Sequence, residues 1–297
     1  MQKVGLIVGN TSNLYEVECE GKIYMCTARG KFKQEEIVPV AGDKVVIEIT
    51  EEEKQEGVIT SIKPRKNYCK RPKMANITQI MFVVSLKMPK PDLLLLDKQL
   101  CFAEWLGIKP IIILNKIDLE QEKNIEYIEN IYKNIGYTVI KTNAKNIEQE
   151  TLHIIKESLK KHITAFSGNS GVGKSTLIND IFKSELTKEG NISQKNKKGK
   201  NTTTKVKLYK LEETAYIADT PGFSTFDITE IEKEEICHYF KEFREYLADC
   251  KYIGCSHIKE QECGIKKALE EGKIAKSRYE NYCKIYEELK EKEENKW

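Results

Sequence analysis

The sequence lacks the segments that mark membrane and secreted proteins. Its longest uninterrupted apolar runs, such as Ile80 to Val84, Leu93 to Leu96 and Ile111 to Leu114, are far shorter than the roughly 18 residues that a helix needs to cross a bilayer. The N-terminal residues offer only a brief apolar stretch and no small-residue cleavage site, so no signal peptide is predicted. These absences indicate a cytoplasmic protein without a membrane partner.

The chain also lacks a strong excess of charge. Its 49 Lys and Arg residues and 46 Asp and Glu residues leave a net charge of +3, and 32% charged beside 40% hydrophobic residues is typical of a folded globular protein. Any polyanionic partner must therefore be argued from local clusters. At 297 residues, with about 150 residues per domain, we expect two domains, or three if one is small.

Residues 1–70 carry short β-like runs. From Tyr15 to Glu20, apolar and acidic residues alternate with the period of two that a half-buried strand requires. The other expected strands are Val4 to Val8, Ile23 to Cys26, Val45 to Ile49 and Val58 to Ile62. Short strands separated by turn residues such as Gly42 and Asp43 predict a small β-barrel domain.

Residues 71–228 alternate apolar strands with helical stretches, which is typical of a parallel α/β sheet. Helical spacing occurs from Leu93 to Leu106 and from Ile125 to Ile135. The expected strands are Ile80 to Leu86, Ile111 to Leu114, Thr138 to Lys141, Ile163 to Phe166, Val206 to Leu211 and Tyr216 to Ala218.

Residues 229–297 show no strand pattern and are predicted to be a helical domain. Tyr279, Tyr282, Tyr286 and Leu289 recur at steps of three or four, so they share one face of a C-terminal helix. We interpret this face as core packing rather than a ligand site.

The most specific motif is a phosphate loop that fits G-x-x-x-x-G-K-[ST] between a predicted strand and a helical start. Its residues are Gly168, Asn169, Ser170, Gly171, Val172, Gly173, Lys174, Ser175 and Thr176. The glycines let backbone N–H groups point at phosphates, Lys174 supplies charge to the β and γ oxygens, and Ser175 offers a hydroxyl to Mg²⁺. We predict phosphate binding rather than a plain glycine-rich turn.

A second motif, Asp219-Thr220-Pro221-Gly222, directly follows a predicted strand. A carboxylate at Asp219 can hold Mg²⁺ through water, and the backbone N–H of Gly222 can sense a γ-phosphate. Alone this D-x-x-G pattern is common, but it adds to the phosphate loop.

A third motif, Asn115-Lys116-Ile117-Asp118, follows the buried strand from Ile111 to Leu114, at an edge where α/β sheets bind ligands. The Asp118 carboxylate can accept hydrogen bonds from N1–H and the 2-amino group of guanine, which adenine does not offer in that arrangement. The three motifs together predict a site for GTP or GDP with Mg²⁺.

The order of the motifs is unusual because the base-reading residues 115–118 precede the phosphate loop. In Ras-like GTPases the base reader comes last, so this order indicates a circular permutation, which a sheet tolerates when the new termini lie in a surface loop. Here Gly222 leads directly into the C-terminal region, so we expect nucleotide state to act on that region.

Cys250, Cys255, His257 and Cys263 form the pattern C-x₄-C-x-H-x₅-C. Three thiolates and one imidazole suit a closed, tetrahedral, structural Zn²⁺ site. The alternative is a set of small buried cysteines with a surface histidine. We favour one zinc ion.

The barrel, the permuted motif order and the Cys/His pattern together resemble the ribosome small-subunit-dependent GTPase family, RsgA, also called YjeQ or YloQ, over nearly the whole chain. Shared residues beyond the three motifs include 41–45, Thr202-Thr203-Thr204, 272–274 and Arg278-Tyr279. The resemblance implies an OB-fold barrel, a circularly permuted GTPase domain and a zinc-binding helical domain. It also implies GTP hydrolysis coupled to late maturation of the 30S subunit, with Mg²⁺ reached by Thr203 or Thr204.

The resemblance further implies that the partners are the 30S subunit and its 16S rRNA, and we expect a monomer that binds no DNA. Two residues bear on hydrolysis, and the first departs from the family pattern. Asn201 stands where the family has His, and an amide cannot take a proton from water. Phe223 stands where Ras-like enzymes have the water-positioning Gln. We therefore expect slow basal hydrolysis that the 30S subunit stimulates.

Two acid-free basic stretches support an RNA partner, because such clusters bind phosphate backbones. The first contains Lys63, Arg65, Lys66, Lys70, Arg71 and Lys73, with Tyr68 among them, and the second Lys195, Lys197, Lys198, Lys200 and Lys205. Two alternatives stay open: an RNA-binding scaffold that uses GTP as a structural ligand, and an ATP-dependent kinase, which would leave Asn115 and Asp118 without a role.

Overall fold

The computed structural model describes residues 2–11, 14–30, 32, 37–189, 206–212, 214–219, 228 and 230–295, with the backbone alone for residues 185–189. The chain divides into two compact units. The first comprises residues 1–81, 144–167 and 174–224, and the second comprises residues 82–143, 168–173 and 225–297.

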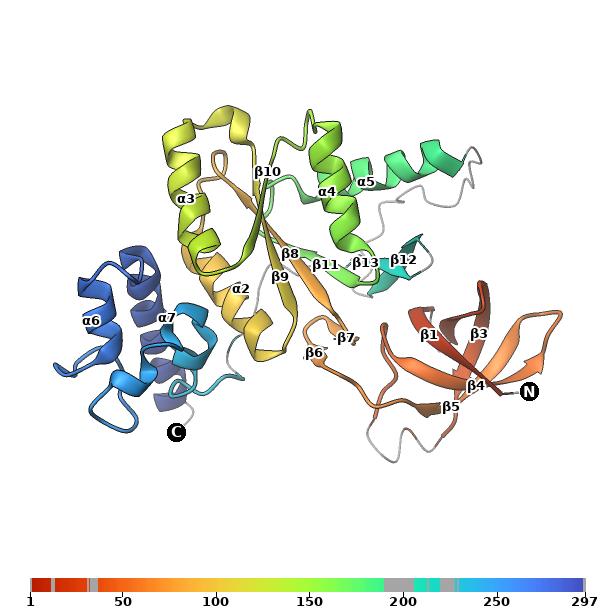
Figure 1. Cartoon of the computed structure of the whole chain (residues 1–297). Helices are drawn as coiled ribbons and strands as arrows, with labels where there is room; N and C mark the ends of the chain where they lie inside the picture. Colours follow the sequence, from red (N-terminus) through yellow and green to blue (C-terminus); the bar gives the residue numbers. More distant parts are fainter. Residues whose placement is uncertain are drawn as a thin grey trace. The chain divides into compact units, whose positions relative to one another are not determined.

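The first unit begins with a closed five-stranded barrel, drawn in red to orange in Figure 1. Its strands follow the order β1-β2-β3-β5-β4 and comprise β1 (Gln2–Thr11), β2 (Leu14–Cys19), β3 (Lys22–Ala28), β4 (Lys44–Glu51) and β5 (Glu56–Ile62). Alternation in β2 buries Val17 and Cys19 in the barrel core with residues such as Tyr24 and Ile59. The predicted OB-type barrel is confirmed.

The turn before β4 is built on a crowded glycine and a buried carboxylate. Gly42 has φ +90, and a Cβ there would lie 1.9 Å from the carbonyl oxygen of Ala75, so only glycine fits. Asp43 is fully buried, and its Oδ1 and Oδ2 accept hydrogen bonds from Nε and Nη2 of Arg65 at 2.7 and 2.8 Å. This bidentate pair fastens the turn to the segment after β5.

The outward acidic residues of β2, Glu16 and Glu18, form what we call the acidic stripe. Nζ of Lys207 donates to Glu16 at 2.9 Å, and Lys210 and the Tyr216 hydroxyl donate to Glu18, the latter at 3.0 Å. Burial and the neighbouring Glu18 charge raise the pKa of Tyr216 above its ordinary value. The stripe is therefore an internal interface rather than a solvated face.

A six-stranded sheet has the order β10-β9-β8-β11-β13-β12, and β8 takes part in both units. Its strands are β8 (Gln79–Ser85), β9 (Lys109–Asn115), β10 (Thr138–Thr142), β11 (Ile163–Ser167), β12 (Lys207–Glu212) and β13 (Ala215–Asp219). The helices along this part of the chain are α2 (Leu93–Trp105), α3 (Glu122–Asn134), α4 (Gln149–Leu159) and α5 (Lys174–Glu189). β9 pairs with β10, and β11 with β13, in parallel, so the carboxyl ends within each pair lie at the same edge.

The structure differs from the expected sheet in two respects. The expectation of a parallel sheet is wrong for β12, which is antiparallel to β13. The chain also forms α4 and an antiparallel ribbon of β6 (Tyr68–Lys70) and β7 (Lys73–Ala75), none of which we predicted.

The described residues 230–295 contain no strand, as expected. They form 3₁₀ turns η3 (Ile236–Tyr239), η4 (Lys241–Phe243) and η5 (Leu247–Asp249), followed by α6 (Gly264–Glu270) and α7 (Lys276–Glu294), drawn in blue in Figure 1. Tyr282 packs with Phe240 and Phe243 at ring-centroid distances of 5.3 and 5.0 Å. This confirms that the aromatic face of the C-terminal helix packs in a core. Within the part of the chain that the structure describes, no helix has the length and apolar character to cross a membrane.

Candidate functional site

The phosphate loop lies between the end of β11 and the start of α5. Gly168 has φ +138, and a Cβ there would lie 2.2 Å from the carbonyl oxygen of Val83. Only glycine therefore fits at the first position of the loop. Gly171 and Gly173 also have positive φ angles, of 77° and 104°. The loop then opens α5, whose first N–H groups are available to an anion.

The residues that begin α5 supply the charged and hydroxyl groups of the predicted site. Lys174 is half-buried, and burial lowers the pKa of its ammonium. Ser175 and Thr176 are exposed in the first turn of the helix. This places three polar side chains and the helix N-terminus immediately after the loop, which suits a nucleotide phosphate chain.

The base-reading motif contacts the phosphate loop. Asn115, which ends β9 and is 1% exposed, donates from Nδ2 to the carbonyl oxygen of Val172 at 2.7 Å. Lys116, at φ 63°, donates from Nζ to the carbonyl oxygen of Gly171 at 2.8 Å and also to that of Met88. Two residues of this motif therefore hold the loop in place, and Asp118, in the 3₁₀ turn η1 (Ile117–Leu119), is exposed.

The parallel partner of β9 ends at the same edge of the sheet, which the sequence did not predict. Thr142, the last residue of β10, lies opposite Asn115, so Asn143, Ala144 and Lys145 follow at the same sheet edge. The buried Oγ1 of Thr142 has no hydrogen-bond partner among the described residues. The sequence signal was the same as at Asn115: polar residues, here Asn143 and Lys145, directly after a strand.

The metal-side motif is described only in part. Asp219 ends β13, which lies parallel to β11 with Ala218 opposite Ala165, so its carboxylate is at the edge where β11 ends. A carboxylate there and the Ser175 hydroxyl are the oxygen donors that Mg²⁺ prefers. Thr203, Thr204 and Gly222 lie outside the described residues, as do Asn201, Phe223 and the second basic stretch.

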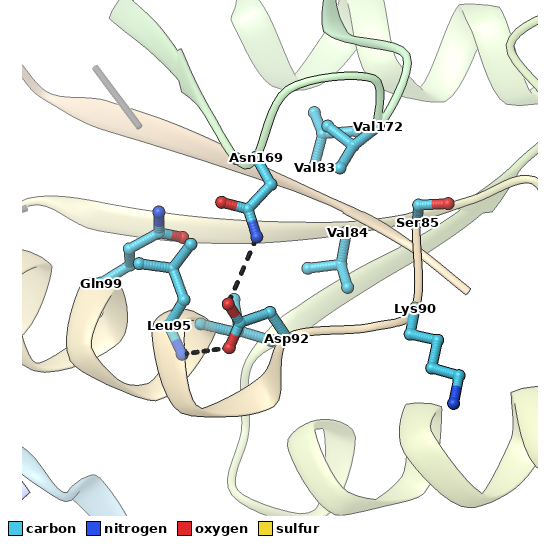
Figure 2. A pocket seen from close by; sticks show the side chains of 11 residues that line it. Val83, Val84, Ser85, Lys90, Asp92, Leu95, Gln99, Asn169 and Val172 are labelled. Atoms are coloured by element: carbon cyan, nitrogen blue, oxygen red, sulfur yellow. Dashed lines mark hydrogen bonds between the residues drawn. The ribbon is translucent and has the colours of Figure 1, made fainter. Parts of the chain in front are cut away.

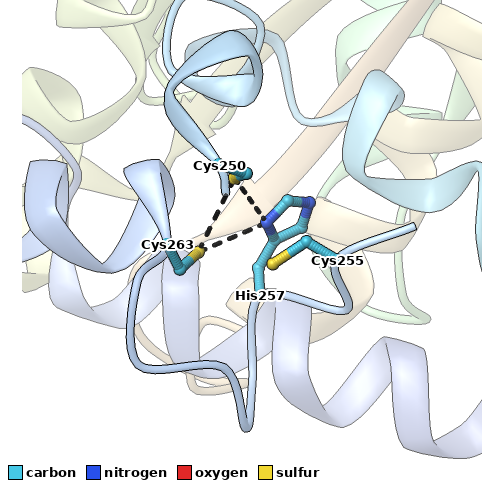
Figure 3. A group of neighbouring side chains, drawn as sticks. All are labelled: Cys250, Cys255, His257 and Cys263. Carbon is cyan, nitrogen blue, oxygen red and sulfur yellow. Dashed lines mark hydrogen bonds between the residues drawn. The ribbon is translucent and has the colours of Figure 1, made fainter. Parts of the chain in front are cut away.

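The four predicted zinc ligands come together in the second unit (Figure 3). The ligand atoms of Cys250, Cys255, His257 and Cys263 lie within 4.8 Å of one another. The sulfur atoms of Cys250 and Cys263 are 3.9 Å apart, and Nδ1 of His257 is 3.5 and 3.4 Å from them. Two sulfurs bound tetrahedrally to zinc at about 2.3 Å are separated by about 3.8 Å, so the donor set fits one zinc ion.

Burial shifts the pKa of two residues of this cluster. Burial raises the pKa of Cys255 to about 12, so thiolates are stable together here only beside a positive charge. Burial lowers the pKa of His257, which keeps its imidazole neutral and able to ligate. The Tyr279 and Tyr282 hydroxyls hold the ligand loop by donating to the backbone oxygens of His257 and Ser256 at 2.7 and 2.9 Å.

One residue of the first basic stretch makes contacts within the protein. Arg65 is bound to Asp43, donates to the carbonyl oxygen of Val38 and lies 4.6 Å from the Tyr68 ring centre. The stretch keeps five exposed basic residues, which are Lys63, Lys66, Lys70, Arg71 and Lys73.

The chain has a closed barrel followed by an α/β sheet, and its base-reading motif precedes its phosphate loop. These features define a circularly permuted P-loop GTPase. The sequence model described as RsgA GTPase matches residues 62–229, and that of the RsgA N-terminal domain matches residues 4–59. The chain belongs to the RsgA GTPase family and is a GTPase, with GTP or GDP and Mg²⁺ as the implied ligands.

Relatives match over the whole chain. The protein named "Small ribosomal subunit biogenesis GTPase RsgA" of Clostridium botulinum (strain Loch Maree / Type A3) is 40% identical over 295 residues, 99% of each chain. The protein of the same name in Caldanaerobacter subterraneus is 38% identical over 99% of this chain and 98% of its own.

Two solved structures agree with the fold. The crystal structure of YjeQ from Thermotoga maritima superposes with a TM-score of 0.85 at 37% identity, covering 97% of this chain and 99% of that one. YloQ, described as a circularly permuted GTPase, superposes with a TM-score of 0.81 at 34% identity, covering 98% and 96%.

Proposed function

We propose that this chain is a GTPase of small-subunit biogenesis that binds the 30S ribosomal subunit, is stimulated by it, and couples hydrolysis to late subunit maturation. The observation that carries the proposal is the 40% sequence identity, over 99% of both chains, with a protein named for small ribosomal subunit biogenesis. A match of that extent includes the barrel, the GTPase motifs and the Cys/His cluster together.

The phosphate site supplies charge stabilisation. The Lys174 ammonium and the N–H groups of residues 168–176 donate to the phosphates, where negative charge develops during transfer. Mg²⁺, when bound, neutralises charge on the β and γ oxygens. The Ser175 hydroxyl, one of Thr203 and Thr204, and Asp219 through water would hold it, and the Gly222 N–H would sense the γ-phosphate.

Base selection is assigned to one exposed carboxylate. Asp118 accepts from the N1–H and 2-amino groups of guanine, while Asn115 and Lys116 keep the phosphate loop in register with the base site. This division of work disfavours an ATP-dependent kinase, which would need no carboxylate at this position.

Hydrolysis needs a group from outside the motifs. The phenyl ring of Phe223 cannot hydrogen-bond water, and the Asn201 amide can orient water but cannot accept its proton. The proposal therefore includes a stimulating element that the small subunit supplies or orders.

The proposed partner is RNA, bound by a basic surface of the first unit. The exposed side chains of Arg71 and Lys73 project from the β6–β7 ribbon near an OB-type barrel, and clustered cations of this kind neutralise phosphates. We propose 16S rRNA as the ligand of this surface, and a cytoplasmic monomer that does not bind DNA. The proposed domains are residues 1–70, 71–228 and 229–297, with one zinc ion holding the last.

The test is GTP turnover at fixed salt, measured with and without purified 30S subunits, with Lys174→Ala as the control. We expect slow turnover alone, strong stimulation by the subunits, and loss of both in the control. Equal turnover with and without 30S subunits that do bind would overturn stimulated hydrolysis and favour the scaffold, in which GTP serves as a conformational ligand.

A further inference from the structure

Among the described residues, three side chains outside the phosphate loop donate to it or accept from it at known distances, and two of these belong to a nucleotide-binding motif. Asn115 and Lys116 hold the carbonyl oxygens of Val172 and Gly171 in the second half of the loop. The third is Asp92, which precedes α2 and faces Asn169 across a small pocket (Figure 2).

Each oxygen of the Asp92 carboxylate has its own partner. Oδ1 accepts the backbone N–H of Leu95 at 3.0 Å, which makes Asp92 the N-cap of α2. Oδ2 accepts from Nδ2 of Asn169 at 3.3 Å. One side chain thus joins the start of a helix to the phosphate loop (Figure 2).

The position of Asn169 explains why such a link matters. Gly168 is fixed by its close approach to Val83, and the carbonyl oxygens of Gly171 and Val172 are fixed by the base-reading motif. Asn169 lies between these two fixed points, in the part of the loop whose N–H groups face the phosphates. A loop that already holds its donors in the bound orientation binds more tightly, because less conformational entropy is lost on binding.

The helix that carries Asp92 at its N-terminus is held by a buried network. One turn further along α2, the fully buried Asp97 accepts from Tyr132, Arg278 and Asn281 at 2.6 to 2.9 Å. This network fixes α2 and therefore the carboxylate at its N-terminus.

We propose that Asp92 is a positioning residue for the phosphate loop, acting through Asn169. It rests on the nucleotide-binding part of the proposed function and is independent of the ribosomal subunit. The effect is directed at phosphates: the affinity for GDP depends on Asp92, whereas the preference for guanine over xanthine does not.

The experiment measures dissociation constants of a fluorescent GDP for the full chain and four variants, together with melting temperatures without nucleotide. Asp92→Ser keeps a capping oxygen but is too short for Asn169, and Asn169→Ala keeps the cap intact. Each should weaken GDP binding about 3- to 10-fold, as expected for one hydrogen bond to a charged acceptor in a partly solvated place. The double variant should be no weaker than either single one, because both remove the same link.

Asp92→Asn is the conservative variant. Its amide can cap α2 through oxygen and donate to Asn169 once that side-chain amide flips, so GDP affinity should stay within about twofold of the unchanged chain. Guanosine, which lacks phosphates, should bind all variants alike.

Each of the following results would overturn the proposal: unchanged GDP affinity in Asn169→Ala, additive losses in the double variant, or an equal loss for guanosine. If Asp92→Ser lost GDP affinity only in proportion to a fall in melting temperature, Asp92 would act as a helix cap alone. That result would also overturn the proposal. If the unchanged chain bound no GDP, the nucleotide-binding part of the proposed function would fail first, which separates the two outcomes.

Discussion

Arg278 and Asp97 lie 181 residues apart in the chain, yet Nη1 of Arg278 donates to Oδ1 of Asp97 at 2.6 Å with both side chains buried. The guanidinium also binds both carboxylate oxygens of Glu242, at 2.7 and 2.9 Å. One buried cation therefore joins α2, the turn η4 and α7. Because its partners are two buried carboxylates, the cluster depends on the arginine.

Replacing this arginine should be strongly destabilising. Arg278→Met leaves Asp97 and Glu242 buried without their cation, so we expect the free energy of unfolding to fall by about 3–5 kcal/mol. The matched control is Arg244→Gln, because Arg244 pairs with Glu104 near the surface, and its loss should cost about 1 kcal/mol or less. Denaturant unfolding followed by tryptophan fluorescence measures both, and equal effects would contradict the assigned role of the buried cluster.

Zinc should be stoichiometric and structural. We expect metal analysis of the purified chain to find one zinc ion, and a strong chelator to lower the melting temperature of the part that contains α6 and α7. Cys255→Ser should reproduce that loss, whereas Cys283→Ser, which alters a cysteine outside the ligand set, should retain the metal. Full zinc content in Cys255→Ser would contradict the assigned ligand set.

Nucleotide choice should follow one carboxylate. Asp118→Asn exchanges an acceptor for an amide, so the preference should move from GTP toward XTP by roughly 1–3 kcal/mol of binding energy. Glu126→Gln, an exposed change on α3, serves as the control. Competition between GTP, XTP and ATP measures the preference, and an Asp118→Asn variant that still preferred GTP would remove Asp118 from base reading.

The exposed basic residues of the β6–β7 ribbon should act through counterion release. Arg71→Ala with Lys73→Ala should weaken RNA binding and reduce the slope of log K against log salt by up to about 2. Arg65→Ala should behave differently, because Arg65 holds the buried Asp43, and should lower barrel stability instead. RNA titrations at several salt concentrations, with thermal unfolding alongside, distinguish the two; a salt slope unchanged in the double variant would exclude this surface.

Two glycines with positive φ allow crowding to be separated from backbone strain. Gly42→Ala would place a Cβ 1.9 Å from the carbonyl oxygen of Ala75, whereas Gly21→Ala meets nothing within 4 Å at a similar φ. We expect Gly21→Ala to cost about 1–2 kcal/mol of unfolding free energy, as positive φ alone does, and Gly42→Ala to cost clearly more. Equal costs, measured by thermal or denaturant unfolding, would mean that the turn relaxes around the added methyl group.

Local patterns predicted most of the framework because each strand carries its own signal. The alternation from Tyr15 to Glu20 corresponds to β2 within one residue, and the apolar run from Ile111 to Leu114 corresponds to β9 within two. The helix α4 was missed although Leu152, Ile155 and Leu159 are buried at helical spacing, since a short polar-rich segment gives few such positions.

What the sequence could not indicate depends on partners distant in the chain. Nothing near Arg65 shows that it faces Asp43, and nothing near Asp92 shows that Asn169 lies opposite. The Cys/His pattern was different, because three cysteines and one histidine at close spacing indicate metal binding from the sequence alone.

The interface between the acidic stripe and β12–β13 has a consequence for truncated proteins. A fragment that began after the barrel would keep Lys207, Lys210 and Tyr216 but lose Glu16 and Glu18, which neutralise the two lysines. Deleting the barrel would therefore create a cationic patch that the intact chain does not display. Attraction of such a fragment to ribosomal RNA would report an artificial surface, and RNA binding by the GTPase domain is better measured with the barrel attached.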